Sequence, residues 1–258
     1  MKAKIISTAL ALATGTLYLS ASVKLTILYD NTIHTPGTRS DWGFSCLVEK
    51  EGYSLLFDAG TQPSILAANA KKLGVDLSAI RHVMISHGHR DHFGGLQAVL
   101  RAASEGVTVY VPPKMPQAAL QEISAAGGKV VPASSAVLPI PGMTSTGILG
   151  DGIPEQGLII RTGKQNILIT GCAHPGIVTI VGSARELVGG SIDVVVGGFH
   201  LSGHSAQAIT GIIQDFRNLG VRRAGPTHCT GEKAIKAFRE SYANDFVEMG
   251  VGQVLEFE

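Results

Sequence analysis

The chain has 258 residues, of which 45% are hydrophobic, and it carries a formal net charge of +1 at pH 7. This length fits one large catalytic domain or two small ones, and the hydrophobic content allows a sizeable core. Basic residues are scattered and the net charge is near zero, which excludes an extended basic surface for nucleic acid, so we expect a small-molecule substrate.

The N-terminal segment has the features of a secretory signal peptide. Two lysines precede an apolar and small-residue run over 5–19, and residues 20–22 offer a cleavage point. The run is shorter than the roughly 20 apolar residues of a membrane span, so no stable membrane insertion is expected after processing. We expect 1–22 to be a signal peptide or N-terminal extension of an exported or periplasmic protein, and 23–258 to form the catalytic domain. Four serine and threonine residues interrupt the run, so an uncleaved start on a cytoplasmic protein remains the alternative.

The first part of the expected domain reads as strands joined by turns. Residues 24–29 are expected to form a strand, and the polar segment 30–41 a loop that could overhang a site. Residues 44–49 and 53–57 have the pattern of a β-hairpin. The second strand of this hairpin ends at Asp58, which is followed by Ala59 and Gly60.

A dense set of metal-binding side chains follows the next apolar strand. The sequence ISHGHRDHFGG over 85–95 contains His87, His89, Asp91 and His92. His87 and His89 point to the same side of an extended chain, whereas Asp91 and His92 can face a second point before a helix predicted over 93–103. Imidazoles with a carboxylate are common ligands of zinc, manganese or iron. The segment therefore predicts a site for one or two divalent metals, and an exposed histidine-rich turn without metal is the alternative.

The rest of the chain alternates between helices and strands. Helices are predicted at 63–73, 115–126, 175–188 and 205–219 and from 231, with a short helical turn at 76–80. Strands are predicted at 107–111, 192–196 and 222–225, and a hairpin at 157–161 and 166–170. The stretch 132–155, rich in proline, glycine and serine, is expected to be irregular or to form short edge strands. The two halves, each with a hairpin, a helix and a strand, predict an α/β fold. We expect an αββα four-layer sandwich, in which two sheets pack face to face with helices outside and the ligands come from loops at one edge.

Three later histidines and one cysteine lie beyond predicted strand ends. His174 follows the second hairpin, and His228 lies between a short strand and a helix. His200 follows the last long strand and is a candidate metal ligand, proton donor or anion-binding group. Cys172, two residues before His174, is either part of the site or a buried apolar residue. The three cysteines include no C-x-x-C pair, so no disulfide framework is expected.

The spacing H-x-H-x-D-H over 87–92 resembles the signature of the metallo-β-lactamase superfamily. The resemblance implies that Asp58 supports the metal loop from behind and that His228 is the last metal histidine. Cys172 stands where family members carry a bridging aspartate or a cysteine ligand. Many members have another metal histidine after the strand matching 107–111, but here two prolines follow it. The first metal then takes His174 instead, or the site holds fewer metals.

Three further segments, TGCAHPGI over 170–177, GGFHL over 197–201 and HCTG over 228–231, resemble the 7,8-dihydropterin-6-methyl-4-(β-D-ribofuranosyl)aminobenzene-5'-phosphate synthase-like group. This resemblance implies a transferase that joins a dihydropterin methyl diphosphate to an arylamine. The implied cofactor is one or two divalent metal ions. Zinc is the expected metal, and manganese, iron and magnesium are the alternatives. Metal-dependent hydrolysis of an ester, amide or phosphoester is the second hypothesis, and a non-catalytic metal-binding sensor is the third.

Overall fold

The structure is a computed structural model that describes residues 22–103, 106–133, 138 and 140–258. The predicted signal peptide therefore lies outside the described residues, apart from Ser22. Among the helices described, none is long and apolar enough to cross a membrane.

The first sheet has seven strands in the order β12-β1-β2-β3-β4-β5-β6. Pairing is antiparallel from β12 to β3 and parallel from β3 to β6. The edge strands β6 and β12 were not predicted, because each has four residues and a weak apolar pattern. The strand bounds are β1 Val23–Tyr29, β2 Ser45–Lys50, β3 Tyr53–Phe57, β4 His82–Met84, β5 Thr108–Val111, β6 Lys129–Pro132 and β12 Val254–Phe257.

The second sheet has five strands in the order β11-β10-β9-β8-β7. The strands β9, β10 and β11 are parallel, and β8 pairs antiparallel with β9, as the predicted hairpin requires. The strand bounds are β7 Met143–Ser145, β8 Leu158–Arg161, β9 Asn166–Thr170, β10 Val194–Gly198 and β11 Arg223–Thr227.

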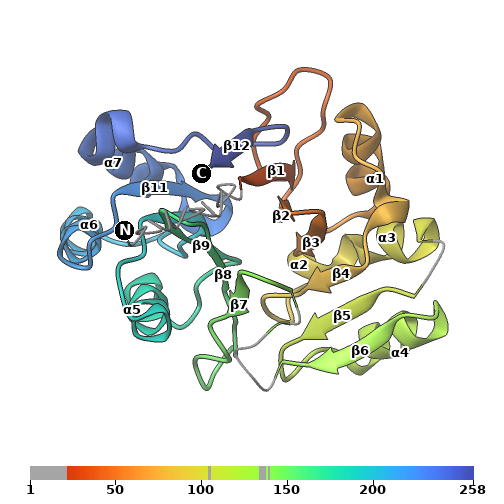
Figure 1. Ribbon diagram of the computed structural model, residues 1–258. Coiled ribbons are helices and arrows are strands. Elements are labelled where there is room, and N and C mark those ends of the chain that lie inside the picture. Colours follow the sequence, from red (N-terminus) through yellow and green to blue (C-terminus); the bar gives the residue numbers. More distant parts are fainter. Residues whose placement is uncertain (1–21, 104–105, 134–137, 139) are drawn as a thin grey trace, which may run out of the picture.

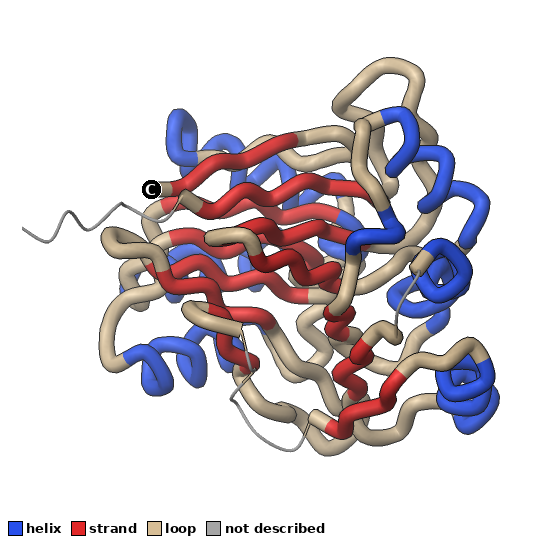
Figure 2. Tube along the Cα trace, turned by 45° about the vertical axis from the view of Figure 1, so that its right-hand side comes forward, coloured by secondary structure: helices blue, strands red, loops and turns tan. Residues whose placement is uncertain are grey.

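Helices cover the outer face of each sheet, which confirms the predicted αββα sandwich (Figures 1 and 2). Successive strand residues enter different cores because side chains alternate between the two faces of a strand. Phe57 joins the cluster between the sheets, whereas Leu56 packs under the helices of the first half. The helices are α1 Pro63–Lys72, α2 Arg90–Phe93, α3 Gln97–Ala102 and α4 Gln117–Ala125 on the first sheet, and α5 Ile177–Val188, α6 Ala206–Asn218 and α7 Glu232–Tyr242 on the second.

The single helix predicted over 93–103 is wrong. The chain instead forms α2, a 3-10 turn over Gly94–Leu96, and then α3. Gly94 and Gly95 pack directly on the turn after β3, where a Cβ at Gly95 would collide with the carbonyl oxygen of Ala59. This close approach holds the end of the metal-binding segment against the turn that carries Asp58.

The parallel pairing brings the candidate site residues together. The carboxyl ends of parallel strands in one sheet meet at the same edge. Asp58 follows β3 and the histidine-rich segment follows β4 in the first sheet, whereas Cys172, His200 and His228 follow β9, β10 and β11 in the second. The two edges face one another across the sandwich.

Candidate metal centre

One group of imidazoles joins the two sheets. The Nε2 atom of His87 lies 3.2 Å from Nδ1 of His89 and 3.2 Å from Nε2 of His174. The ligand atoms of these three histidines all lie within 4.8 Å of one another. His174, which the sequence offered as a substitute for the missing family histidine, therefore lies beside the first two histidines of the H-x-H-x-D-H segment.

A second group consists of Asp91, His92 and His228, whose ligand atoms also lie within 4.8 Å of one another. Oδ2 of Asp91 is 3.3 Å from Nε2 of His228 and 3.6 Å from Nε2 of His92. The Nε2 atom of His228 is buried and makes no hydrogen bond with the described groups. Because buried polar atoms normally have a partner, this donor set fits a divalent metal ion that would supply one.

Cys172 lies between the two groups. Its Sγ is 3.3 Å from Nε2 of His92, and it forms a further close set with His87 and His92. His87 belongs to the first imidazole group and His92 to the second. The thiol is therefore in contact with both groups, as a bridging ligand would be, and it is buried.

The electrostatics of three candidate ligands favour their metal-binding forms. Burial, and then the neighbouring histidines, hold the pKa of His87 far below its usual range. Burial and His200 lower the pKa of His174 to about 4. Burial alone would raise the pKa of Asp91, but the nearby rings of His228 and His92 lower it overall. Neutral imidazoles and an ionised carboxylate are the forms that bind metals.

Asp58 lies behind these ligands and is fully buried. Its carboxylate is 2.6 Å from Nδ1 of His92 and accepts hydrogen bonds from the backbone N–H and the hydroxyl of Ser86, both at 2.7 Å. The Ser86 hydroxyl in turn is 2.9 Å from Nδ1 of His87. Asp58 thus orients one ring of each group, directly for His92 and through Ser86 for His87.

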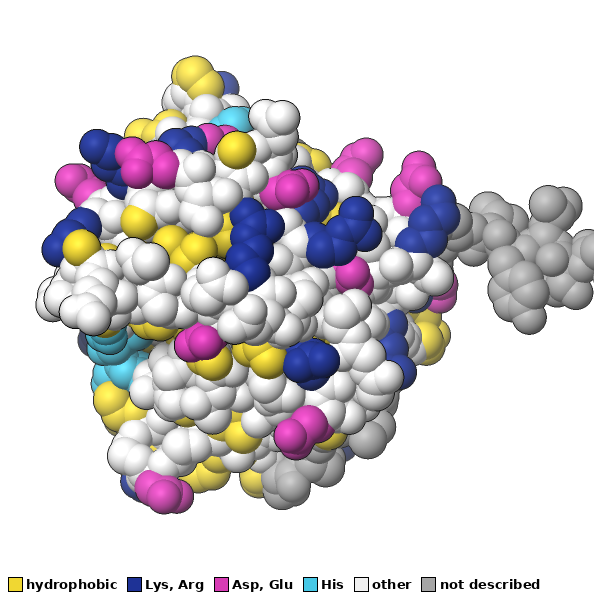
Figure 3. Space-filling model, turned by 90° about the vertical axis from the view of Figure 1, so that its left-hand side faces the viewer, with side chains coloured by type: hydrophobic (Ala, Val, Ile, Leu, Met, Phe, Trp, Pro, Cys, Tyr) yellow, Lys and Arg dark blue, Asp and Glu magenta, His cyan; other side chains and the backbone are white. Residues whose placement is uncertain are grey.

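His200 lies at the exposed mouth of the centre. Its ring centroid is 4.4 Å from that of His174, and its pKa is raised, first by a hydrogen bond with Cys229. Histidine side chains gather at one edge of the molecular surface in Figure 3. The position agrees with each role that the sequence left open for His200.

Trp42 and Glu155 are among the residues that contact the candidate ligands and that the sequence analysis missed. Trp42 donates its indole N–H to Oδ2 of Asp91 at 2.8 Å, and its ring lies 4.9 Å from that of His228. Glu155, in the segment predicted to be irregular, accepts hydrogen bonds from the turn that carries Cys172 and His174. A signal for Trp42 was available, since it is the single tryptophan of the chain and follows the polar loop. A lone glutamate in a glycine-rich and proline-rich segment gave none.

Asp30 ties the end of β1 to the strand that precedes His228. Both of its carboxylate oxygens accept from the Thr227 hydroxyl, at 2.8 and 2.7 Å. Burial raises the pKa of Asp30 to about 6, although the hydrogen bond from Thr227 opposes the shift. The folded state therefore binds this proton more tightly than the unfolded state does. Protonated Asp30 thus stabilises the folded state at low pH, and this stabilisation is lost as the pH rises through about 6.

We expect the Asp30→Asn variant to be more stable than the parent at pH 8 by about 2 kcal/mol, because the amide removes the buried charge. At pH 4 the two proteins should differ little. Urea unfolding of the metal-free proteins at both values checks this. Equal stability differences at pH 4 and pH 8 would show that Asp30 does not titrate as the structure indicates.

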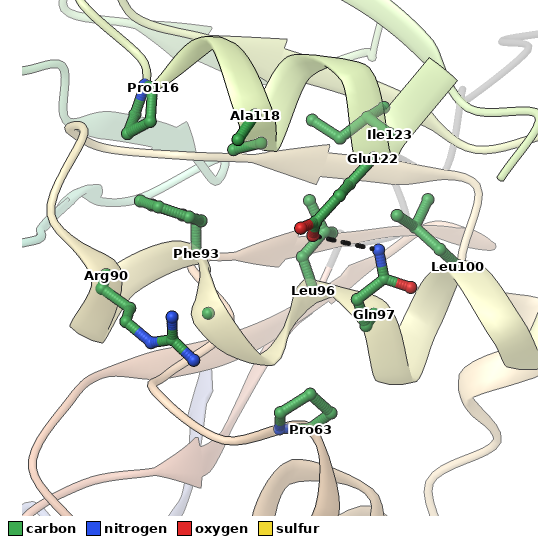
Figure 4. Close-up of a pocket in the computed structure, with 12 residues that line it drawn as sticks. Pro63, Arg90, Phe93, Leu96, Gln97, Leu100, Pro116, Ala118, Glu122 and Ile123 are labelled. Atoms are coloured by element: carbon green, nitrogen blue, oxygen red, sulfur yellow. Dashed lines mark hydrogen bonds between the residues drawn. The ribbon is translucent and has the colours of Figure 1, made fainter. Parts of the chain in front are cut away.

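A separate pocket of about 340 Å³ lies between α4 and the segment from α2 to α3 (Figure 4). Arg90 and Phe93 line it, with Glu122 and Ile123 of α4 opposite. No candidate metal ligand lines this pocket. It is therefore distinct from the metal centre, although Arg90 is the neighbour of Asp91.

Known proteins of one superfamily are similar to this chain. The family model described as the metallo-beta-lactamase superfamily matches residues 43–228. A 7,8-dihydropterin-6-methyl-4-(beta-D-ribofuranosyl)-aminobenzene-5'-phosphate synthase of Methanocaldococcus jannaschii is 27% identical, over 84% of this chain and 90% of that protein. The crystal structure of a metal-dependent hydrolase of the beta-lactamase superfamily is 30% identical, with a TM-score of 0.75, and the match covers 92% of this chain and 99% of that one. The crystal structure of a diphosphatase of the PhnP family is 17% identical, with a TM-score of 0.62, and the match covers 92% of this chain and 97% of that one. This similarity shows a shared fold.

Proposed function

Because the chain belongs to the metallo-β-lactamase superfamily, we propose that it is a metal-dependent enzyme with a binuclear centre. The observation that carries this proposal is the pair of three-residue groups with Cys172 between them. One metal position is assigned to His87, His89 and His174, and the other to Asp91, His92 and His228. Cys172 is assigned as the bridge. Imidazole and thiolate ligands favour zinc or iron over magnesium, and zinc is our first choice.

The leading activity joins the methyl carbon of a dihydropterin methyl diphosphate to the amine of a ribofuranosylaminobenzene phosphate. Diphosphate is the leaving group. This activity is supported by the synthase relative, which is similar over most of both chains. Divalent cations in this centre would supply positive charge that neutralises a diphosphate leaving group. To His200, at the mouth, we assign the binding of an anionic group of the substrate or the movement of a proton. The indole N–H of Trp42 donates a hydrogen bond to Asp91 and orients its carboxylate.

Hydrolysis of an ester, amide or phosphoester is the second candidate. It is favoured by the 30% identity to a protein whose structure is described as a metal-dependent hydrolase. The two activities share one centre and differ in the acceptor, which is an amine in the first and water in the second.

The test measures diphosphate release from dihydropterin methyl diphosphate by the zinc-loaded protein, with and without the ribofuranosylaminobenzene phosphate. We expect release that depends on the arylamine, with formation of the coupled product. Release without the amine, giving the hydroxymethyl pterin, would favour the hydrolase instead. No release under either condition, from protein that holds two metal ions, would contradict the transfer activity. An Asp91→Ala sample serves as the blank.

A further inference from the structure

Glu155 makes an unusual set of contacts in the interior. Its side chain is fully buried. Oε1 accepts hydrogen bonds from the backbone N–H groups of Cys172 and Ala173, and Oε2 accepts from that of His174, all at 2.8 Å. One carboxylate therefore satisfies three consecutive amides of the turn that carries two candidate ligands.

This turn depends on such a partner. Ala173 has a φ of 64°, in the left-handed region that non-glycine residues rarely adopt, and the turn comes directly after β9. A buried N–H group without a partner costs about 1–3 kcal/mol, and bonds to a charged acceptor are stronger than neutral ones. Glu155 thus offsets both the strain at Ala173 and the burial of three amides.

The next residue, Gln156, makes hydrogen bonds to the segment that leads to His87. Gln156 donates its backbone N–H to the carbonyl of Ser86 at 3.0 Å, and its side-chain amide donates to the carbonyl of Ile85 at 2.9 Å. Ile85 and Ser86 immediately precede His87. The dipeptide Glu155-Gln156 therefore connects the strand end before His87 to the turn that carries His174.

From this connection we propose that Glu155 is a positioning residue, which presents His174 to the metal position that it shares with His87 and His89. The inference rests on the binuclear centre proposed above. Nε2 of His174 lies 3.2 Å from Nε2 of His87, although the two residues are 87 positions apart and lie in loops that follow strands of different sheets. A shift of the turn by one ångström would change that pairing. The second position, made by Asp91, His92 and His228, has no hydrogen bond to Glu155 among the contacts described. Its link to Glu155 is indirect, through the turn residue Cys172, whose Sγ lies beside His92.

The Glu155→Gln variant tests this assignment. Whichever way the glutamine amide is turned, at least one of the three N–H groups faces an –NH₂ group in place of an acceptor. Loss of a residue that orients a ligand typically weakens metal affinity about 10–100-fold, and we expect that loss for the zinc ion at the His174 position, with a smaller loss for the ion that shares only Cys172 with the turn. Affinity is measured by competition with a chromogenic chelator, and metal content by plasma mass spectrometry. Glu186→Gln, the same change on the exposed surface of α5, is the matched control.

Double variants separate positioning from a general loss of structure. Glu155→Gln combined with His174→Ala should hold the same amount of zinc as His174→Ala alone, because both changes act on one position. Combined with His228→Ala, it should leave no tightly bound zinc. Backbone amide exchange of 172–174, followed by mass spectrometry, should be faster in Glu155→Gln than in the parent. Glu155→Asp, which retains the charge with a shorter reach, provides a second variant if Glu155→Gln does not fold, and should show the same selective loss.

Two tight zinc ions in a folded Glu155 variant, or equal weakening of both ions, would overturn the positioning role. A parent protein that binds no metal after reconstitution would overturn both the binuclear centre and this inference. A parent with two ions and a variant with two ions would overturn the inference alone.

Discussion

The His87→Ala variant is expected to lose at least one of two bound metal ions and to lose activity with it. His87 lies in both the imidazole group with His89 and His174 and the close set with His92 and Cys172. Removing its ring therefore opens one metal position and loosens the bridge to the other. Metal centres contribute several kcal/mol to catalysis, so turnover should fall by about 1,000-fold or more.

Plasma mass spectrometry and turnover of the same preparation check this result. His82→Ala is the matched control, because His82 begins β4 five positions earlier and belongs to none of the candidate ligand groups. It should retain both metal ions and most of the activity. Full metal content and full activity in His87→Ala would show that the ligand assignment is wrong.

The Asp58→Ala variant is expected to unfold with a free energy about 3–5 kcal/mol smaller than the parent, because it leaves one partner of a buried ion pair alone. Burial alone would lower the pKa of His92, but the charge of Asp58 outweighs it and raises this pKa to about 9. Without the carboxylate, the buried ring and the amide of Ser86 lose their partner. Metal affinity should fall as well, since the orientation of His92 is lost.

Urea unfolding of the metal-free proteins at pH 7 measures the stability, and chelator competition measures the affinity. Asp215→Ala, on the exposed face of α6, should stay within about 0.5 kcal/mol of the parent. An Asp58→Ala protein with parental stability and affinity would show that the carboxylate does not hold the metal loop.

The architecture could be predicted because its signals are local. Strands β3 and β9 have apolar residues facing two cores, and each ends in a turn with the residue types of a site. The histidine-rich segment after β4 supplies four candidate ligands within six positions, so chain geometry alone brings them close together. From two halves of similar pattern, the sequence indicated two sheets between helices and placed the ligands at strand ends.

The residues that contact those candidate ligands could not be predicted from the same local sequence patterns. Glu155 meets its three amides across 17 to 19 positions, and Trp42 meets Asp91 across 49. β12 becomes a strand because β1, more than 200 positions earlier, offers it an unpaired edge. The break between α2 and α3 follows from contact with the turn after β3, which a helical pattern does not record.

The sequence by itself determined the fold class, the ends of the strands that lead to the site and the candidate ligands, because period, turn chemistry and ligand spacing are properties of short segments. Only the tertiary structure decided which ligands belong together. His174 pairs with His87, and His228 with Asp91, because the packing of two separate sheets sets the distance between loops that are far apart in the chain.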